Sequence, residues 1–291
     1  MRKVAIITGV TSFLGSSVAK KLLSKDFIVF GVVRPNSKNI SKLTHIEGLK
    51  IIEIDFENLK TDDFKNVDRL NIDKIKNENV DITFLHFGWG HTLDRLNFAM
   101  QMLNIDYSMK VLEFAKMLNA KRFIFAGSQG ELSGSPYGMA KKQFSERATR
   151  DLKNNLMQFI HLRIFSIYGS GDRETSLIKS LVRSIKENKD IDLSLCDYKW
   201  NYLYIDDFTE IVYRFIDKKI KTGTYDVASD DTRMLREYVE SAKASFNSNI
   251  KLNFGKRMNS SETFSLPHIE KTIKAVGDID FTKFEEGILK V

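Results

Sequence analysis

The stretch VAIITGVTSFLG, residues 4–15, decides the fold of this chain. Its first part, Val4–Thr8, is a β-branched apolar run with the length of a buried strand. Residues 14–24 then carry apolar side chains at positions 14, 18, 22 and 23, which is helical spacing. Small residues, with Gly9 and Gly15 six apart, join the two. A strand that turns through small residues directly into a helix predicts the first βα unit of an α/β domain.

The same alternation of apolar runs and helical patterns continues along the chain. Further strands are predicted at residues 27–33, 50–54, 81–87, 122–126 and 159–164, and long helices at 96–118 and 137–152. Strands that are apolar on both faces and separated by helices predict a doubly wound parallel sheet, a Rossmann fold. The order is less regular after Tyr168, where residues 176–188 and 235–246 predict helices and residues 202–205 and 225–228 predict strands.

The composition excludes several classes of protein. The net charge of +7 comes from single lysines scattered among acidic residues, so we expect no nucleic-acid partner. No stretch approaches the roughly 18 apolar residues that span a bilayer, and the opening apolar run is too short for a signal peptide. The one cysteine, Cys196, cannot form an internal disulfide. No His/Cys spacing indicates a metal. We therefore expect a cytoplasmic protein with no membrane partner.

The loop after the first strand is suited to a phosphate group. Backbone N–H groups of small residues can approach a pyrophosphate at the positive end of the following helix. The residues that we expect to hold it are Thr8, Gly9, Thr11, Ser12, Phe13, Leu14 and Gly15. A glycine every third residue would place one at position 12, where the chain has serine. Ser12 would strain the turn if φ is positive there, or its hydroxyl would replace a water on the phosphate.

The ends of the next two strands indicate which dinucleotide the loop would bind. An acidic residue after the second strand would take the ribose hydroxyls of NAD, whereas an arginine accommodates the 2′-phosphate of NADP. Arg34 stands at that place, so NADP is the expected cofactor, with NAD as the alternative. Asp55 and Phe56, at the end of the third strand, are candidates for the adenine edge, although Asp55 could equally cap the following turn.

A serine, a tyrosine and a lysine carry the candidate chemistry. Ser128 follows the predicted strand 122–126, and Tyr137 and Lys141 are four residues apart on one face of the next predicted helix. A phenol titrates near pH 10, and a nearby ammonium moves it toward the working pH of a general acid. A hydroxyl at the end of a strand can hydrogen-bond a substrate carbonyl. Tyr-x-x-x-Lys alone is a weak indication of a catalytic site, because it occurs by chance in many helices. It becomes a strong one here because it follows Ser128 and because the chain also has the glycine loop at residues 9–15.

These residues resemble the extended short-chain dehydrogenase/reductase family, in its nucleotide-sugar epimerase/dehydratase/reductase branch. The segments Leu162–Gly169, Trp200–Asp207 and Gly223–Ser229 resemble further family segments in the same order. The sequences of Trp200–Asp207 and Phe125–Gln129 most resemble the corresponding segments of reductases that make deoxyhexoses for surface polysaccharides, such as lipopolysaccharide O-antigen or capsule. The loop between Ser128 and Tyr137 is shorter than is usual in the family.

The resemblance implies roles for individual residues. Ser128, Tyr137 and Lys141 would be catalytic, and Tyr137 and Lys141 would also contact the cofactor. Phe87, Gly88, Phe165 and Ser166 would line the cofactor. The expected substrate contacts are Ser128 and Gln129, and Trp89, which follows the predicted strand 81–87 on the side where the substrate should lie. Arg173 and Arg257 are candidates for the substrate diphosphate that no spacing selects. Residues 1–169 and 198–229 would form the NADP-binding domain, and residues 170–197 and 230–291 the substrate-binding lobe. A homodimer would form through a four-helix bundle of residues 96–118 and 137–152.

The family performs several reactions, and the residues narrow the choice. Related 4,6-dehydratases place an Asp-Glu pair directly after the catalytic hydroxyl residue, but Gln129-Gly130 follows here and Glu131 stands alone. Epimerisation at carbons 3 and 5 would need an extra acid–base pair, which in one relative includes a cysteine beside the catalytic serine, and here the one cysteine, Cys196, is distant in sequence. We therefore expect an NADPH-dependent reductase of the 4-keto group of a CDP-, dTDP- or GDP-linked 4-keto-6-deoxyhexose. An NAD-dependent 4-epimerase is the alternative, and a catalytically degenerate dinucleotide-binding regulator or scaffold is the non-enzyme reading.

Three isolated residues have both a functional and a structural interpretation. His86, at the end of the predicted strand 81–87, could touch the sugar, but a structural role is favoured. Asn104 could belong to a buried water relay behind the lysine or could make a polar core contact. Arg233 is a further candidate for the substrate diphosphate, although no spacing selects it.

Overall fold

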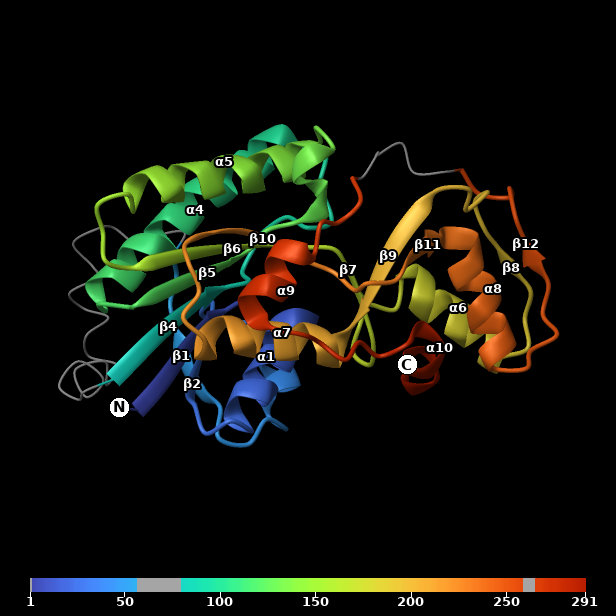
Figure 1. Cartoon of the computed structure of the whole chain (residues 1–291), viewed down its shortest axis with the longest axis horizontal. Helices are drawn as coiled ribbons and strands as arrows, with labels where there is room; N and C mark the ends of the chain where they lie inside the picture. The colour runs from blue at the N-terminus through green and yellow to red at the C-terminus, as the bar shows by residue number, and fades with distance from the viewer. Residues whose placement is uncertain (1, 57–79, 259–264) are drawn as a thin grey trace. The chain divides into compact units, whose positions relative to one another are not determined.

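The structure of the protein is a computed structural model that describes residues 2–56, 80–258 and 265–291 (Figure 1). The chain divides into two compact units. The first unit comprises Met1–Arg163 and Val212–Tyr225, and the second comprises Ile164–Ile211 and Asp226–Val291. Parts of both predicted domains, residues 57–79 and 259–264, lie outside the described residues.

The largest sheet has seven strands in the order β10-β6-β5-β4-β1-β2-β3. Their bounds are β1 (Arg2–Thr8), β2 (Ile28–Val33), β3 (Lys50–Glu53), β4 (Val80–His86), β5 (Arg122–Ala126), β6 (Gln158–Ile164) and β10 (Gly223–Val227). All neighbouring pairs from β3 to β6 are parallel. The direction of winding reverses between β1 and β4, which is where open α/β sheets bind their ligands. The predicted doubly wound parallel sheet is confirmed.

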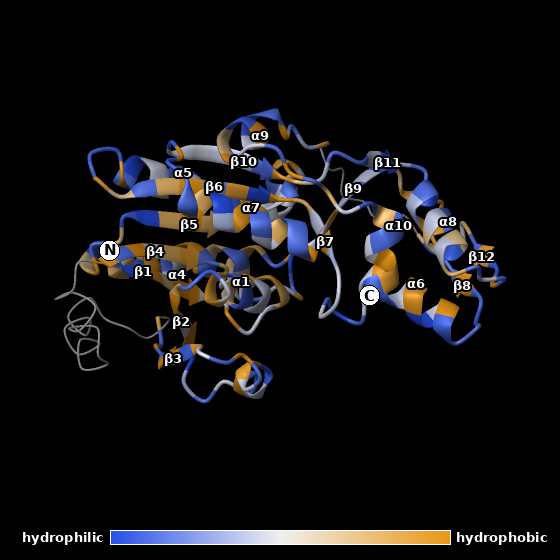
Figure 2. Cartoon of the chain, turned by 60° about the horizontal axis from the view of Figure 1, so that its bottom comes forward, coloured by the Kyte–Doolittle hydropathy of each residue, from blue (hydrophilic) through white to orange (hydrophobic). Residues whose placement is uncertain are grey.

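The central strands are buried on both faces, as their composition predicts. Ile6, Ile7, Phe84 and Leu85 are each at most 1% exposed. Figure 2 shows β1 and β4 mainly in the colour of hydrophobic residues. Parallel strands read as continuous apolar runs because helices cover both faces of the sheet.

Three helices of the first unit pack on the sheet: α1 (Phe13–Leu23), α4 (Phe98–Met117) and α5 (Pro136–Asp151). Figure 1 shows α4 and α5 side by side over one face of the sheet and α1 on the other. Helix α4 begins two residues later than predicted because the side chain of Asn97 accepts a hydrogen bond from Met100 N and caps the helix. Short 3₁₀ helices, labelled η, occur at Ile40–Leu43 (η1) and Gln129–Leu132 (η4).

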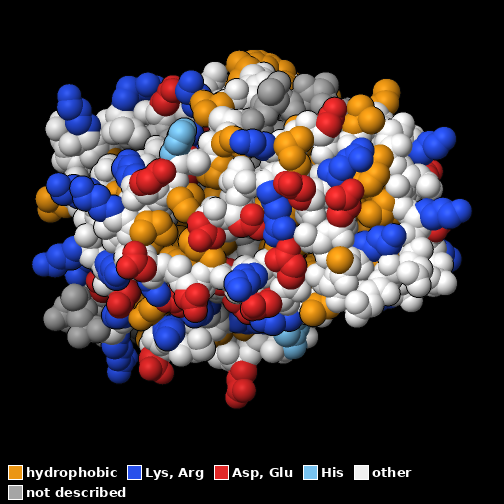
Figure 3. Space-filling view, turned by 45° about the vertical axis from the view of Figure 1, so that its right-hand side comes forward, with side chains coloured by type: hydrophobic (Ala, Val, Ile, Leu, Met, Phe, Trp, Pro, Cys, Tyr) orange, Lys and Arg blue, Asp and Glu red, His pale blue; other side chains and the backbone are white. Residues whose placement is uncertain are grey.

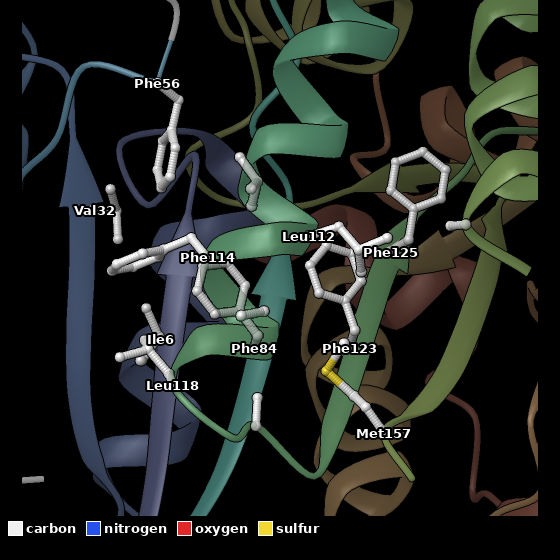
Figure 4. Packing of buried hydrophobic residues seen from close by; sticks show 14 of the residues in the cluster. Ile6, Val32, Phe56, Phe84, Leu112, Phe114, Leu118, Phe123, Phe125 and Met157 are labelled. Atoms are coloured by element: carbon white, nitrogen blue, oxygen red, sulfur yellow. The ribbon is translucent and has the colours of Figure 1, made fainter. Parts of the chain in front are cut away.

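Aromatic rings fill the space between the sheet and helices α4 and α5 (Figure 4). Phe84 of β4 and Phe123 of β5 stack with their planes 5° apart and their centroids at 5.6 Å. Phe114 of α4 meets Phe84 edge to face at 6.2 Å. Offset and edge-to-face pairs add to the stabilisation that burial of the rings provides. This core fixes α4 and α5 against the strands whose carboxyl ends carry the candidate site.

The second unit contains two small sheets and short helices. Its elements are β7 (Ser166–Tyr168), α6 (Leu177–Lys186), β8 (Ile191–Asp192), β9 (Lys199–Tyr204), β11 (Thr232–Met234), α8 (Leu235–Ser245), β12 (Leu252–Asn253), α9 (Glu270–Val276), α10 (Phe284–Gly287) and η5 (Ile288–Lys290), and α7 (Ile205–Asp217) crosses the division. The sheets have the strand orders β11-β9-β7 and β12-β8. Tyr168, Tyr202, Tyr238 and Phe284 pack their rings together as its core.

The surface carries mixed charge. Figure 3 shows basic and acidic side chains interspersed on the face that it draws. Within residues 2–56, 80–258 and 265–291, no helix is both long enough and apolar enough to cross a membrane.

Candidate active site

The turn from β1 to α1 has the close backbone packing that its glycines predict. Gly9 has φ +67°, and a Cβ there would lie 2.6 Å from the backbone nitrogen of Gly88. A Cβ on Gly15 would lie 2.3 Å from the carbonyl oxygen of Gly9. Any larger residue at either position would push β1, β4 and α1 apart.

Ser12 does not strain the turn, which corrects one of the two readings of this residue. Its φ of −81° is ordinary extended backbone, and it caps α1 by accepting a hydrogen bond from Gly15 N at 3.1 Å. The hydroxyl therefore satisfies a first-turn N–H group of α1 instead of leaving it to a ligand. The N–H groups of Phe13 and Leu14 have no partner within the helix, as in any first turn. Together with the positive end of the helix dipole, they fit a pyrophosphate group.

The end of β4 is tied to the end of β1 by hydrogen bonds. Gly88 N donates to Thr8 Oγ1 at 3.2 Å, and Thr8 Oγ1 is 2.7 Å from His86 Nδ1. The other ring nitrogen, Nε2, is 2.9 Å from Ser108 Oγ on α4. His86 is fully buried, so the predicted structural role is the one that the geometry supports. Burial, reinforced by the Lys141 ammonium, lowers the pKa of His86 from 6.5 to about 3.

The segment after β4 is held by two amide side chains of α4. Trp89 Nε1 donates to Gln101 Oε1 at 3.0 Å, which anchors the indole. Asn104 Oδ1 accepts from Gly90 N at 2.6 Å, and Asn104 Nδ2 donates to Gly90 O at 3.2 Å. Asn104 thus makes a polar contact in the core, which is one of the two roles that the sequence left open for it. The pair Gln101 and Asn104 fixes where Trp89 lies relative to the sheet.

Ser128 begins η4 as its N-cap, directly after β5. Its Oγ accepts a hydrogen bond from Gly130 N at 3.1 Å, so the hydroxyl proton remains available for donation. The backbone N–H of Ser128 donates to the carboxylate of Glu131 at 2.8 Å. Ser128 and Gln129 are both partly exposed at the carboxyl end of the strand, and Glu131 is buried.

Helix α5 places Tyr137 and Lys141 as predicted. The Ser135 side chain caps the helix through Gly138 N, and Pro136 occupies its first turn. Tyr137 is partly exposed, while Lys141 is 4% exposed and donates its ammonium proton to Ala126 O at the end of β5. The Lys141 Nζ lies 5.3 Å from the centroid of the Tyr137 ring. The ammonium is therefore held beside the phenol, between β5 and α5.

Aromatic faces surround the buried ammonium. The Lys141 Nζ lies 4.8 Å from the ring centroid of Trp89 and 5.2 Å from that of Phe125. Trp89 also meets Tyr137 edge to face at 6.3 Å. Cation–π attraction stabilises a desolvated ammonium by about 2 kcal/mol, which offsets part of the cost of its burial. Trp89 is thus brought into contact with two of the three candidate catalytic residues.

The short loop between Ser128 and Tyr137 fits because η4 packs on the start of α5. A Cβ on Gly138 would lie 1.8 Å from the carbonyl oxygen of Gly130. Glycine after Tyr137 therefore lets η4 approach the helix, and the eight residues 129–136 suffice to connect Ser128 with Tyr137. The structure brings both side chains to the carboxyl end of β5.

The other predicted site residues lie at several places. Arg34 is exposed at the end of β2, and Asp55 is partly exposed after β3. Phe56 is 1% exposed and packs on Phe114, so only its backbone remains for contact with a cofactor. Thr11, Phe13, Leu14, Phe87 and Gly88 are partly exposed in the first unit.

Four predicted residues belong to the second unit. Phe165 is buried and Ser166 begins β7, while Arg173 and Arg257 are exposed. Arg233, the further candidate for a diphosphate, is instead engaged with Asp231 and Glu285, each at 2.8 Å. Burial opposes its charge, but these two carboxylates raise the pKa of Arg233.

Sequence reasoning missed several residues that build the site. Gln101 orients Trp89, and Arg95 lies over the ring of Tyr137 with its CZ atom 4.7 Å from the centroid. Glu131 and His161, separated by thirty positions, form a hydrogen bond of 2.9 Å beneath Ser128. The one signal in the sequence was the histidine at position 161, in the middle of the predicted strand 159–164. No group of three or more His, Cys, Asp or Glu side chains able to hold a metal ion occurs in the described part of the chain.

The sheet order and the turn after β1 are those of the Rossmann class, in which the corresponding turn binds a dinucleotide. The model of the NAD dependent epimerase/dehydratase family matches residues 5–228, and the chain belongs to this family, which is part of the extended short-chain dehydrogenases/reductases.

Similarity to individual proteins extends over nearly the whole chain. The chain is 25% identical over 266 residues to the CDP-abequose synthase of Salmonella muenchen, and the match covers 88% of this chain and 85% of that protein. A UDP-N-acetylglucosamine 4-epimerase from Methanobrevibacter ruminantium, in complex with UDP-N-acetylmuramic acid, superposes with a TM-score of 0.82 at 18% identity, covering 100% and 97% of the two chains. A dTDP-glucose 4,6-dehydratase from Bacillus anthracis, in complex with NAD, gives 0.80 at 15% identity, covering 99% and 94%. The two solved structures share the fold.

Proposed function

We propose that this protein is an NADPH-dependent reductase of the 4-keto group of a nucleotide-linked 4-keto-6-deoxyhexose. The observation that carries the proposal is that the ammonium of Lys141 binds the end of β5, two residues before Ser128, and lies 5.3 Å from the centroid of the Tyr137 ring, while the carboxylate of Glu131 is turned into the protein. The similarity to a CDP-abequose synthase supports a CDP-linked substrate ahead of the dTDP- and GDP-linked forms.

Each of the three residues has a role in this reaction. The bound nicotinamide cofactor would supply the hydride for the ketone carbon. Tyr137 donates its phenolic proton to the ketone oxygen as that oxygen gains charge. Ser128 donates a hydrogen bond to the same oxygen, and the ammonium of Lys141 favours the phenolate that remains. The partly exposed Tyr137 is open to solvent, from which its proton can be replaced.

The burial of Glu131 argues against dehydration. Elimination of water needs an acid that reaches the departing hydroxyl and a base that reaches a carbon-bound proton. One carboxylate oxygen of Glu131 accepts from Ser128 N and lies 2.9 Å from His161 Nε2, and the side chain is 4% exposed. Glu131 is therefore not presented to a substrate, and a simple hydride reaction remains.

An NAD-dependent 4-epimerase is the second candidate, favoured by the similarity to 4-epimerases of the same fold. Such an enzyme would need the same three residues, because it oxidises and then reduces the same carbon. Arg34 supports NADPH and thus the reductase, since the exposed guanidinium can hold a 2′-phosphate bidentately.

The direct test follows the absorbance of NADPH at 340 nm with CDP-, dTDP- and GDP-linked 4-keto-6-deoxyhexoses. We expect oxidation of NADPH with one of these substrates, and a fall in kcat of about 10²–10⁴-fold in Tyr137→Phe, with NADPH binding retained. Consumption of a UDP-hexose with no net change at 340 nm would establish the epimerase instead. If no substrate in either set reacts, the proposal is wrong.

We further propose that two copies associate through α4 and α5, in the cytoplasm. Phe98, Leu103 and Met117 of α4 and Met139 of α5 are between 38% and 59% exposed. Exposed apolar side chains on adjacent helices favour burial against a second copy. Light scattering should give twice the mass of 33.5 kDa, and Leu103→Glu should give the monomer. A monomeric wild-type protein at micromolar concentration would refute the dimer.

A further inference from the structure

The pair Glu131 and His161 lies directly beneath Ser128 and has no role in the reaction described above. Both side chains are 4% exposed, and Glu131 Oε1 is 2.9 Å from His161 Nε2. The same carboxylate oxygen accepts the backbone N–H of Ser128 at 2.8 Å. A buried carboxylate is costly unless its hydrogen bonds are made, so each of these two contacts stabilises the other.

The far side of the imidazole is anchored on two further elements. His161 Nδ1 lies 2.9 Å from Ser145 Oγ of α5 and 3.1 Å from Thr224 Oγ1 of β10. The carboxylate of Glu131 can only accept, which assigns the ring proton to Nε2, and the single lone pair of Nδ1 then accepts from one of the two hydroxyls. Ser145 is one helical turn beyond Lys141 on α5. The imidazole therefore joins η4, which carries Ser128, to the helix that carries Lys141.

The residue before Ser128, Gly127, has no room for a side chain. A Cβ on Gly127 would lie 2.1 Å from His161 Nε2 and 2.4 Å from Glu131 Oε1. The ring of His161 also stacks on Phe125, with centroids at 5.5 Å and planes 27° apart. The ring and the carboxylate thus pack together against the same side of Gly127, in the segment that follows β5.

We propose that Glu131 and His161 are positioning residues that hold Ser128 in register with Tyr137 and Lys141. The proposal rests on the proposed function, because it assigns Ser128 a contact with the reacting oxygen. Glu131 fixes the backbone of Ser128, and His161 fixes Glu131 to α5 and β10. A shift of a catalytic group by about 1 Å can lower turnover by about 10²-fold.

The test is a double-mutant cycle between Glu131 and Ser128. We expect Glu131→Ala to lower kcat by about 10²-fold with the Kd for NADPH unchanged. In a Ser128→Ala background, the same substitution should lower kcat by less than about threefold, because a positioning residue acts through the group that it positions. Glu131→Gln retains an oxygen that accepts from Ser128 N and His161 Nε2, and it should keep kcat within about tenfold of wild type.

The matched control is Asp81→Ala, at the opposite end of the same strands. Asp81 accepts hydrogen bonds from Arg122 at 2.8 and 3.1 Å, and Arg122 begins β5, roughly 13 Å along the strand from Ala126. This variant loses a half-buried carboxylate and should have a lower Tm with wild-type kcat. If Glu131→Ala has wild-type kcat, or lowers kcat by the same factor with and without Ser128, the proposal is wrong.

A measurement independent of turnover separates this proposal from the function itself. Amide hydrogen exchange in the peptide 127–133 should be faster in Glu131→Ala than in wild type or Asp81→Ala, because the Ser128 N–H loses its acceptor. If the wild-type protein reduces no substrate but exchange in 127–133 is faster in Glu131→Ala, the proposed reductase activity is wrong, whereas the proposal that Glu131 positions Ser128 is supported. Unchanged exchange would overturn the positioning role whatever the activity.

Discussion

The neutral, buried imidazole of His86 predicts a specific loss of stability in mild acid. The folded pKa is lowered from 6.5 to about 3, first by burial and then by the Lys141 ammonium. Between these values the unfolded chain binds a proton at this position that the folded chain does not. The contribution of His86 is therefore fully present above about pH 6.5 and is lost progressively as the pH falls toward 3.

The size of the effect follows from the two pKa values. Each pH unit within the window costs up to about 1.4 kcal/mol, and the loss from pH 8 to pH 5 comes to about 2 kcal/mol. Hydrogen bonding does not prevent protonation, because the oxygens of Thr8 and Ser108 can both accept from a charged ring. Exclusion of water from the space between β4 and α4 is what disfavours the cation.

The assay is urea unfolding at several pH values between 5 and 8. The chain has two tryptophans, so Trp200→Phe leaves Trp89 as a fluorescent reporter of the first unit. The comparison is with His86→Gln in the same background, which retains polar atoms but does not titrate. Going from pH 8 to pH 5, the free energy of unfolding should fall by about 2 kcal/mol more with histidine than with glutamine, a midpoint shift of about 1 M urea.

Only the difference between the two pH profiles is used, so a uniform destabilisation by glutamine does not affect the result. Carboxylates that begin to titrate near pH 5 are shared by both proteins and cancel. Parallel profiles for histidine and glutamine would refute the reasoning, because they would mean that His86 has the same pKa in the folded and the unfolded chain.

Three further predictions concern single residues of the first unit. Ser12→Ala removes the cap of α1 and should lower the free energy of unfolding by about 1 kcal/mol, while Ser12→Gly should cost only a few tenths, both measured in urea. Gly127→Ala should lower it by about 1–3 kcal/mol, because the new Cβ meets buried atoms of His161 and Glu131. Arg34→Gln should weaken NADPH binding about 10–100-fold in a fluorescence titration and leave NADH binding unchanged; an equal loss for both would refute the 2′-phosphate contact.

The strands and long helices of the first unit were predictable because their signals are local. An apolar run such as Val4–Thr8 and a helical repeat such as that of α5 depend on residues within one or two turns of each other. The start of α4 was placed at residue 96 instead of Phe98 because apolar periodicity continues through Leu96, whereas the cap at Asn97 decides the boundary.

The second unit was harder to predict. Its strands β8, β11 and β12 have two or three residues each, too few to establish a period. Arg233 shows the same limit for function: Asp231 lies only two positions before it, but nothing near it in the sequence indicates that Glu285, 52 positions later, also binds its guanidinium.

The sequence by itself determined the glycine turn and the fold class, and it predicted that Ser128, Tyr137 and Lys141 lie together, because each depends on short spacings and on the rule that parallel strands end at one edge. Only the tertiary structure decided which polar groups are buried and with what partners. Burial and the Lys141 ammonium disfavour the charged form of His86. The buried carboxylate of Glu131 bonds to His161, a residue of β6 thirty positions further along the chain. Burial and pairing at such separations are properties of the folded core, and no local pattern carries them.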